Sequence, residues 1–264
     1  MTAIMIPRGV LRAEWIKLRS VRSTYVAVLA AVTLGLGVGL LGIASIAHNW
    51  ATMSPSSRAG FDPVGDSFDG FQFGELALGA LGVLAISTEY SSGLIRATFA
   101  AVPRRGLVFA AKAALLGGFA LVLGETCAFA AFLLSQVILS SAHIGVGLGT
   151  PGVLRAVMGA GLYLAAVTMI GFGIGALLRH TAGALAALFA LLFLTYPAAE
   201  AVQSFTIVPD RWLLINVAAS LATVHPATGV GANRVPSPPM ALVELVVYLL
   251  VFLGLGAWRM SRDA

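Results

Sequence analysis

The chain has 264 residues, of which 59% are hydrophobic and only 10% are charged, and its formal net charge is +5. A soluble globular chain is typically ~25% charged, so this composition excludes a water-soluble fold. The basic residues are fourteen Arg and two Lys. In a chain this apolar, we interpret them as topology signals and expect no nucleic-acid partner. Cys127 is the single cysteine, so no intrachain disulfide can form.

Six apolar stretches are long enough to cross a membrane as helices. A transmembrane helix needs ~20 apolar residues, within a range of ~17 to 25. Helices are expected because lipid offers backbone groups no hydrogen-bond partner. The sequence therefore predicts an all-α polytopic membrane protein, with residues 1–264 forming one transmembrane domain. The predicted spans cover approximately residues 25–47, 71–87, 113–140, 154–178, 182–198 and 240–258.

The positions of Lys and Arg predict the orientation of these spans. With the N-terminus in the cytoplasm, twelve of the sixteen basic residues fall in cytoplasmic segments. This excess follows the positive-inside rule and predicts that both ends of the chain are cytoplasmic. The first apolar run exceeds the ~7 to 15 residues of a signal-peptide core, so we expect no cleavage there. The external basic residues are Arg58, Arg155, Arg211 and Arg234.

Two long segments lie outside the membrane in this topology. Residues 48–70 contain Pro55, Gly60 and Pro63, and they are expected to form a loop. Within residues 200–239, the apolar run from Trp212 to Ala222 is too short to span the bilayer. This run therefore predicts a re-entrant or interfacial helix.

The sequence contains no recognisable catalytic or metal-binding motif. A Gly-x-x-x-x-Gly-Lys-Ser/Thr phosphate loop is absent, so we expect the chain to have no ATPase site of its own. The His-Glu-x-x-His zinc motif and the Gly-x-Ser-x-Gly nucleophile motif are absent as well. We therefore predict no catalytic residue, no metal site and no cofactor.

Glu125 is the carboxyl that lies deepest within a predicted span, about twelve residues from the start of that span. A charge at the bilayer centre costs ~2.5 to 3.5 kcal/mol on insertion scales. Glu125 either belongs to a transport pathway or helix interface, or is a protonated or hydrogen-bonded carboxyl that stabilises helix packing. Glu75, Glu200 and Glu244 fall near predicted outer ends, where the cost is smaller.

The first cytoplasmic segment, from Val10 to Thr24, predicts an amphipathic helix at the membrane surface. In such a helix Trp lies at headgroup depth and Arg contacts lipid phosphates. The alternative is a topology anchor without a further role. The helix presents two adjoining faces, with Leu11, Trp15 and Leu18 on one and Arg8, Arg12 and Arg19 on the other.

The loop between the second and third spans, residues 89–105, predicts a short ordered helix. Ser91 or Ser92 is expected to cap it, and Gly93 permits a sharp turn. Pro103 is expected to end it. Four charged side chains of this loop either make charge-assisted contacts with a soluble protein or only fix topology: Glu89, Arg96, Arg104 and Arg105.

This loop also carries a family resemblance. Its pattern, Glu-Tyr-x-x-Gly-x-Ile-Arg-x-Thr followed by Pro-Arg-Arg, resembles the cytoplasmic loop of type-two ABC exporter permeases. Four further segments are similar to actinobacterial members of the family: residues 14–20, 61–64, 152–156 and 177–183. Residues 200–239 depart from the family pattern. The resemblance implies a homodimer or heterodimer of six-helix subunits in the plasma membrane. It also implies that each subunit docks on a separate cytoplasmic ATPase through the amphipathic helix and the loop.

We therefore expect a permease subunit of an ABC exporter, surrounded by membrane lipids and driven by ATP hydrolysis in a separate subunit. One alternative is a secondary transporter or channel that works alone, for which Glu125 would be the coupling or selectivity residue. Another is a membrane assembly factor that transports nothing. The sequence does not identify the substrate.

Overall fold

The structure, a computed structural model, describes residues 8–202, 212–224 and 235–262. Regular secondary structure in these residues is entirely helical, and six of the described helices are long and apolar enough to cross a membrane. The predicted all-α fold with six apolar helices is thereby confirmed. Five of the six are α2 (Arg22–Asn49), α4 (Phe71–Ser91), α6 (Arg105–Ser140), α7 (Val153–Leu178) and α11 (Pro238–Ser261).

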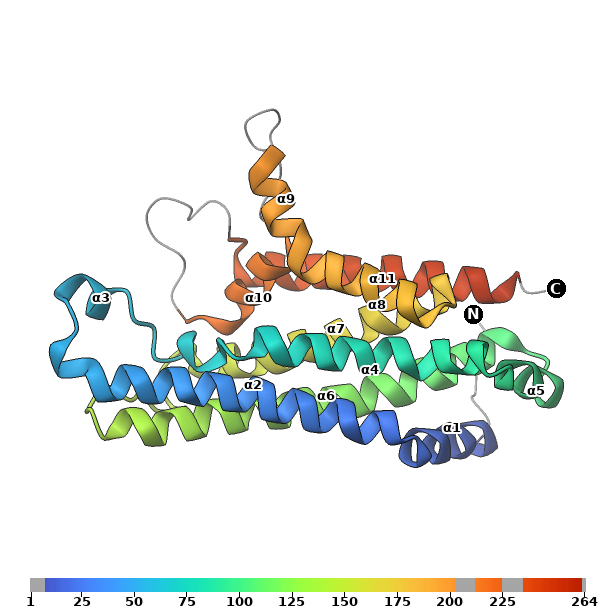
Figure 1. The fold of residues 1–264 in the computed structure, drawn as a ribbon, viewed down its shortest axis with the longest axis horizontal. Helices are drawn as coiled ribbons and strands as arrows, with labels where there is room; N and C mark the ends of the chain where they lie inside the picture. The colour runs from blue at the N-terminus through green and yellow to red at the C-terminus, as the bar shows by residue number, and fades with distance from the viewer. Residues whose placement is uncertain (1–7, 203–211, 225–234, 263–264) are drawn as a thin grey trace.

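Helix α7 lies at the centre of the bundle and packs against α4, α6 and α11 (Figure 1). Its backbone approaches α4 very closely because glycines lie at the contact. A Cβ atom added at Gly82 of α4 would collide with the carbonyl oxygen of Thr168, and one added at Gly171 would collide with that of Gly79. Helices that associate in lipid commonly use small residues for such contacts. The α4–α7 pair therefore forms the tightly packed centre of the protein.

The fifth apolar helix, Thr181–Ala201, is interrupted in its middle. It begins as α8 (Thr181–Phe189), continues as a π-helical segment (Ala190–Leu194) and ends as α9 (Thr195–Val202). Pro197 has no N–H to donate, and its ring conflicts with the carbonyl four residues earlier, which lies in the π-helical segment. Figure 1 shows α9 turned away from the line of α8. The predicted span is therefore bent, and π-helical insertions are a recognised cause of such bends.

The segment between α2 and α4 is more regular than the expected loop. It contains two short 3-10 helices, η1 (Trp50–Thr52) and η2 (Asp66–Phe68), and the α-helix α3 (Pro55–Ala59). Ser54 caps α3, because its hydroxyl accepts a hydrogen bond from the backbone N–H of Ser57 at 3.1 Å. Pro55 thus begins a short helix here, and Gly60 ends it.

The predicted short helix near residue 212 is present as α10 (Leu214–Ala222). Its buried side chains Leu214, Val217 and Leu221 pack in the same apolar core as residues of α7 and α11. Residues 203–211 and 225–234, which include Arg211 and Arg234, lie outside the described part of the chain. Whether α10 lies at the membrane interface or re-enters the bilayer stays a prediction.

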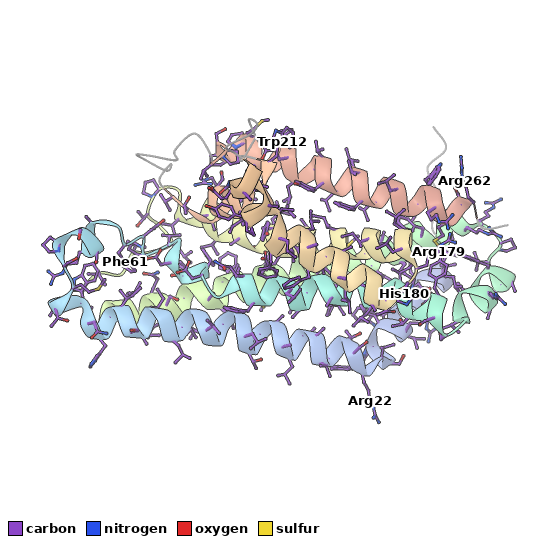
Figure 2. All side chains as sticks on the ribbon, turned by 45° about the horizontal axis from the view of Figure 1, so that its top comes forward. Arg22, Phe61, Arg179, His180, Trp212 and Arg262 are labelled. Atoms are coloured by element: carbon purple, nitrogen blue, oxygen red, sulfur yellow. The ribbon has the colours of Figure 1, made fainter. Side chains whose placement is uncertain are left out.

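Two short helices, α1 (Arg8–Ser20) and α5 (Leu94–Ala101), lie at one end of the bundle (Figure 1). Figure 2 shows Arg179 and Arg262 at this end, opposite Phe61. The predicted serine cap of α5 is wrong. The N-cap is Gly93, with φ of 73°, and the hydroxyls of Ser91 and Ser92 donate instead to the carbonyl of Thr88, at 3.1 and 2.7 Å. Helix α6 begins at Arg105 instead of residue 113.

Candidate functional site

The site is a buried cluster of two glutamates and two lysines at the end of the bundle that holds α1 and α5. We call it the charge cluster: Glu14 and Lys17 of α1, Glu89 of α4 and Lys112 of α6. These two lysines are the only lysines of the chain. The other strongly basic side chains are arginines, so both lysine ammonium groups of the chain lie in this one place.

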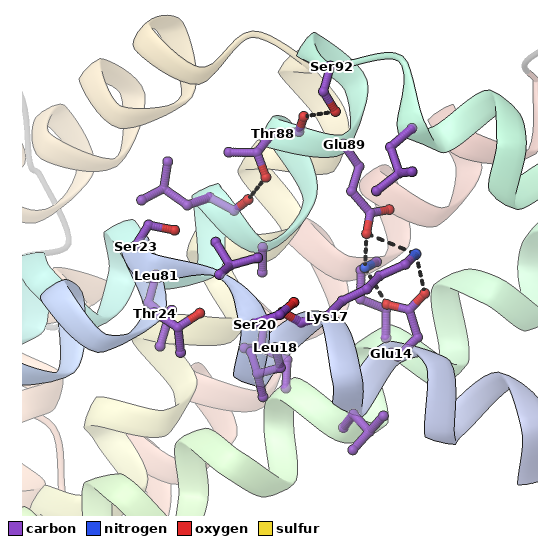
Figure 3. A pocket seen from close by; sticks show the side chains of 17 residues that line it. Glu14, Lys17, Leu18, Ser20, Ser23, Thr24, Leu81, Thr88, Glu89 and Ser92 are labelled. Atoms are coloured by element: carbon purple, nitrogen blue, oxygen red, sulfur yellow. Dashed lines mark hydrogen bonds and ion pairs between the residues drawn. The ribbon is translucent and has the colours of Figure 1, made fainter.

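Lys112 and Lys17 each join α1 to α4. The Lys112 ammonium donates to a carboxylate oxygen of Glu14 and, at 2.8 Å, to Glu89 Oε1. Lys17 Nζ lies 2.8 Å from Glu14 Oε1 and 3.1 Å from Glu89 Oε1. It also donates to Thr98 Oγ1 of α5 at 3.3 Å. Figure 3 shows Lys17 between Glu14 and Glu89. The charge cluster thus connects four helices.

Three members of the charge cluster are almost completely buried. The side chains of Glu14, Lys112 and Glu89 are 4, 7 and 8% exposed, and that of Lys17 is 27% exposed. Burial favours the neutral form of Glu14, but the charges and hydrogen bonds of Lys112 and Lys17 outweigh it and lower the pKa of Glu14. Burial disfavours the charged form of Lys17 and would lower its pKa. The hydrogen bonds and charges of Glu14 and Glu89 outweigh this effect, so the pKa of Lys17 is raised. Both pKa shifts favour the charged forms of Glu14 and Lys17 in α1.

The local sequence explains how α1 presents both of its charged side chains. Glu14 and Lys17 are three residues apart in a helix and therefore lie on one face of α1. Glu89 lies in the last turn of α4 and Lys112 in the third turn of α6. Lys is suited to the centre of such a cluster because its ammonium has three donors that can reach acceptors in different directions.

A cavity of about 330 Å³ adjoins the charge cluster (Figure 3). Its wall is amphipathic, with the charge cluster and the hydroxyls of Ser20, Thr88 and Ser92 on one part and leucine side chains on the other. The leucines include Leu81 of α4 and Leu116 of α6. Residues of α1, α4 and α6 thus line this cavity together.

The sequence-predicted loop residues lie in different environments. Glu89 is buried and contacts the two lysines, so it does not lie on an exposed surface as expected for contact with a partner. Arg96 of α5 and Arg104, directly before α6, are exposed. Arg105 is half-buried, with its guanidinium 5.2 Å from the centre of the Phe99 ring. Of the four predicted residues, the structure places Arg96, Arg104 and Arg105 where another molecule can reach them.

The predicted amphipathic pattern of α1 is divided between two environments. Leu11 and Trp15 line an open groove beside α6, and Leu18 packs against the core near Ile86. Arg12 and Arg19 are exposed. The sequence pattern did not reveal the third, buried face of α1, which carries Glu14. Attachment of this helix to the membrane surface stays a prediction.

Glu125 lies on α6 where that helix meets α7. A Cβ atom added at Gly161 of α7 would come within 2.7 Å of the Glu125 carboxyl carbon, so glycine makes room for the carboxyl. Glu125 Oε2 is buried and has no hydrogen-bond partner among the described residues. Glu125 follows Lys112 of the charge cluster by thirteen positions on the same helix, and it does not line the cavity beside that cluster.

A second, acidic cavity of about 250 Å³ lies at the opposite end of the bundle. Asp62, Asp66, Asp69 and Glu75 line it together with apolar side chains, and the Tyr163 hydroxyl donates to Glu75 at 2.6 Å. Burial, reinforced by the charge of Asp69, raises the pKa of Asp66 to about 6. Burial also raises the pKa of Asp69. This cavity is therefore acidic, and burial raises the pKa of two of its carboxyls.

Comparisons of the chain with protein-family models, curated proteins and solved structures find no match. The fold and composition define a multi-pass helical membrane protein. Its candidate functional site is the charge cluster that joins α1, α4, α5 and α6.

Proposed function

We propose that this protein is the permease subunit of an ABC exporter in the plasma membrane, with ATP hydrolysed by a separate cytoplasmic subunit. The proposal is supported by six apolar helices, the positive-inside charge pattern and the resemblance of residues 89–105 to the family loop. The observation that carries it is the position of α5. This helix has exposed charge on its surface and a hydrogen bond to the buried charge cluster behind it.

In this proposal α5 receives force from the ATPase and the charge cluster passes it to the spanning helices. Lys17 contacts Thr98 of α5 and Glu89 of α4, so a displacement of α5 acts through Lys17 on the end of α4. Lys112 extends the same connection to α6. Buried ion pairs suit this role because their geometry is specific and breaking one of them is costly. Closure of the ATPase then changes the packing of α1, α4 and α6 together.

A separate energy source is required by the proposal because the sequence has no phosphate loop. The ATPase is expected to contact the exposed side chains Arg96 and Arg104, whose guanidinium groups bind carboxylates in a fork geometry. Two permease subunits, identical or different, complete the transporter. The cytoplasmic end is assigned to the side of α1 and α5 by the positive-inside rule.

Glu125 favours a second candidate function, a transporter that works without an ATPase. An ionisable side chain within a spanning helix, with a buried oxygen lacking a described partner, is a common feature of ion and proton pathways. In that mechanism Glu125 would bind the coupling ion or proton. The two candidates differ in whether a second subunit is needed, and this difference can be measured.

The test is purification of the tagged chain from its native membranes in a mild detergent, followed by mass spectrometry of the proteins that accompany it. The proposed function predicts a soluble protein with a phosphate-loop motif in near-stoichiometric amount, and ATP hydrolysis by that complex but not by the chain alone. Transport by the purified chain alone in vesicles, driven by an ion gradient without ATP, would establish the second candidate instead.

A further inference from the structure

The wall of the cavity beside the charge cluster changes from polar to apolar along α4. Ser92, Glu89 and Thr88 line the cavity at the end of the helix, and Leu84 and Leu81 line it further into the span. Figure 3 shows Ser92 and Thr88 toward one end of α4 and Leu81 toward the other. At 1.5 Å per residue, Leu81 and Glu89 are separated by ~12 Å along the helix axis. A bilayer changes from headgroups to hydrocarbon in the same direction, so the cavity has the polarity of a membrane amphiphile.

The apolar part of the cavity is formed by leucines of two spanning helices. Leu81 and Leu84 come from α4, and Leu115 and Leu116 come from α6. These side chains offer no hydrogen-bond partner, and water gains little by entering an apolar space. This part of the cavity is therefore suited to an alkyl chain.

The polar part of the cavity has one unused hydrogen-bond acceptor and one unused donor. Glu89 Oε2 is buried and has no hydrogen-bond partner among the described residues. The Lys112 ammonium has three N–H groups, of which two donate to Glu14 and Glu89. Both Glu89 and Lys112 line the cavity. Because buried polar groups are ordinarily hydrogen-bonded, a ligand group that both donates and accepts would complete this part of the site.

The charge cluster also restricts the charge of a ligand. Its two glutamates and two lysines balance one another. A carboxylate or an ammonium group in the cavity would add an uncompensated charge beside side chains that are almost completely buried, which is unfavourable. A hydroxyl group donates and accepts a hydrogen bond without adding charge. The chemistry of the polar part therefore favours a neutral, hydroxylated headgroup.

We propose that this cavity binds a neutral amphiphile with a hydroxyl-bearing headgroup and a single alkyl chain, such as a monoacylglycerol. The hydroxyl groups contact Glu89 and Lys112, and the chain lies along the leucines. The volume of about 330 Å³ is at the lower end of the range for ligand pockets, which suits one chain and a small headgroup. This inference goes beyond the proposed function and does not depend on an ATPase partner.

The test is photo-cross-linking of the purified chain in phosphatidylcholine nanodiscs. The probe is monodecanoylglycerol with a diazirine in its chain, and mass spectrometry should locate the label on α4 and α6 near Leu81 and Leu116. Unlabelled monodecanoylglycerol should compete with the probe. Decanoate and decylamine should need about tenfold higher mole fractions in the membrane, because each would bring a charge into the neutral site. Free glycerol should not compete, because it lacks the chain.

Variants of the apolar wall test the location of the site. Leu84→Trp should reduce labelling by about tenfold or more, because the indole ring fills a cavity of this size. The matched control is Leu29→Trp on α2, where the replaced side chain is 63% exposed, and it should label as wild type does. Ala85→Leu adds less volume to the same wall and serves where Leu84→Trp does not fold.

Three results would overturn the inference. The first is equal labelling of the Leu84→Trp or Ala85→Leu variant and the Leu29→Trp control, which would mean general contact with membrane lipid. The second is competition by decanoate or decylamine as strong as that of monodecanoylglycerol, which would show that the site does not select a neutral headgroup. The third is competition by free glycerol, which would show that the alkyl chain is not bound.

Discussion

Lys112 of α6 and Glu14 of α1 form a buried ion pair although 98 positions separate them in the sequence. The pair fastens α1 to the bundle at a point where Lys17 and Glu89 complete the charge cluster. Because the cluster has two positive and two negative side chains, its net charge is zero and each side chain depends on the others. Removing one member therefore leaves an uncompensated buried charge.

Lys112→Ala is expected to destabilise the protein by ~3 to 5 kcal/mol, because it leaves two buried glutamates facing Lys17 alone. Thermal unfolding in detergent and protease sensitivity of α1 would measure the loss. The double variant Glu14→Leu/Lys112→Met is the control. It removes both partners and should recover much of the stability, since apolar replacements of a buried pair are often neutral. Unchanged stability of Lys112→Ala would show that the charge cluster does not hold α1.

Gly82→Ala is expected to separate α4 from α7, because the added methyl group collides with the Thr168 carbonyl. Overpacking of this kind costs ~1 to 3 kcal/mol. The matched control is Gly37→Ala on α2, where no atom lies within 4 Å of the added methyl group. Thermal unfolding of the two variants in detergent should show lower stability than wild type for Gly82→Ala only. Equal stability of both variants would contradict the close α4–α7 contact.

The spans were predictable from hydropathy because each spanning helix is continuous in sequence. The bend in the fifth span could not be predicted from hydropathy, because it follows from Pro197 and a π-helical segment within an apolar run. The prediction also began the third span after Lys112, because a charge is unfavourable inside lipid. The structure resolves this conflict by burying Lys112 against Glu14 and Glu89.

The charge cluster itself was only partly predictable. Glu89 was singled out, but as a contact for another protein, and its partners Glu14, Lys17 and Lys112 were missed. Sequence patterns report neighbours along one helix, whereas this cluster depends on how three separate helices pack. One signal was present in the sequence: both lysines of an otherwise arginine-only basic set belong to the cluster.

Glu125→Leu is expected to insert normally and to stabilise the protein, because removing a carboxyl near the bilayer centre avoids ~3 kcal/mol of insertion cost. Thermal unfolding and a transport assay in vesicles would be measured together. Unchanged transport would assign Glu125 a role in α6–α7 packing. Lost transport in a folded variant would favour the transporter that works without an ATPase, and lower stability would contradict the energetic argument.

Stability should depend on Asp66 between pH 5 and 7. Its pKa in the folded protein is raised to about 6, above the ~3.9 of an unfolded chain, so the folded state binds this proton more readily. This contribution to stability therefore increases as pH falls through 6 and is lost as pH rises. Asp62, Asp69, Glu75 and Tyr163 line the same cavity.

The measurement compares melting temperatures at pH 5 and pH 7 in wild type and Asp66→Asn. The variant should show a smaller gain on acidification, because it lacks the titrating carboxyl. Asp69→Asn should also reduce the gain, since the charge of Asp69 helps raise the pKa of Asp66. Identical pH profiles for wild type and Asp66→Asn would contradict the assignment.

The central claim is that α5 docks on a separate ATPase, and charge reversal at Arg96 tests it most directly. The measurement is the ratio of ATPase to permease recovered from native membranes with Arg96→Glu, with Arg22→Glu as a matched exposed control at the same end. Loss of a docked charge contact costs ~2 to 5 kcal/mol, so Arg96→Glu should reduce recovery at least about tenfold and abolish transport. Arg22→Glu should retain both. Equal recovery of an ATPase with Arg96→Glu, or no ATPase with the wild-type chain, would contradict the account.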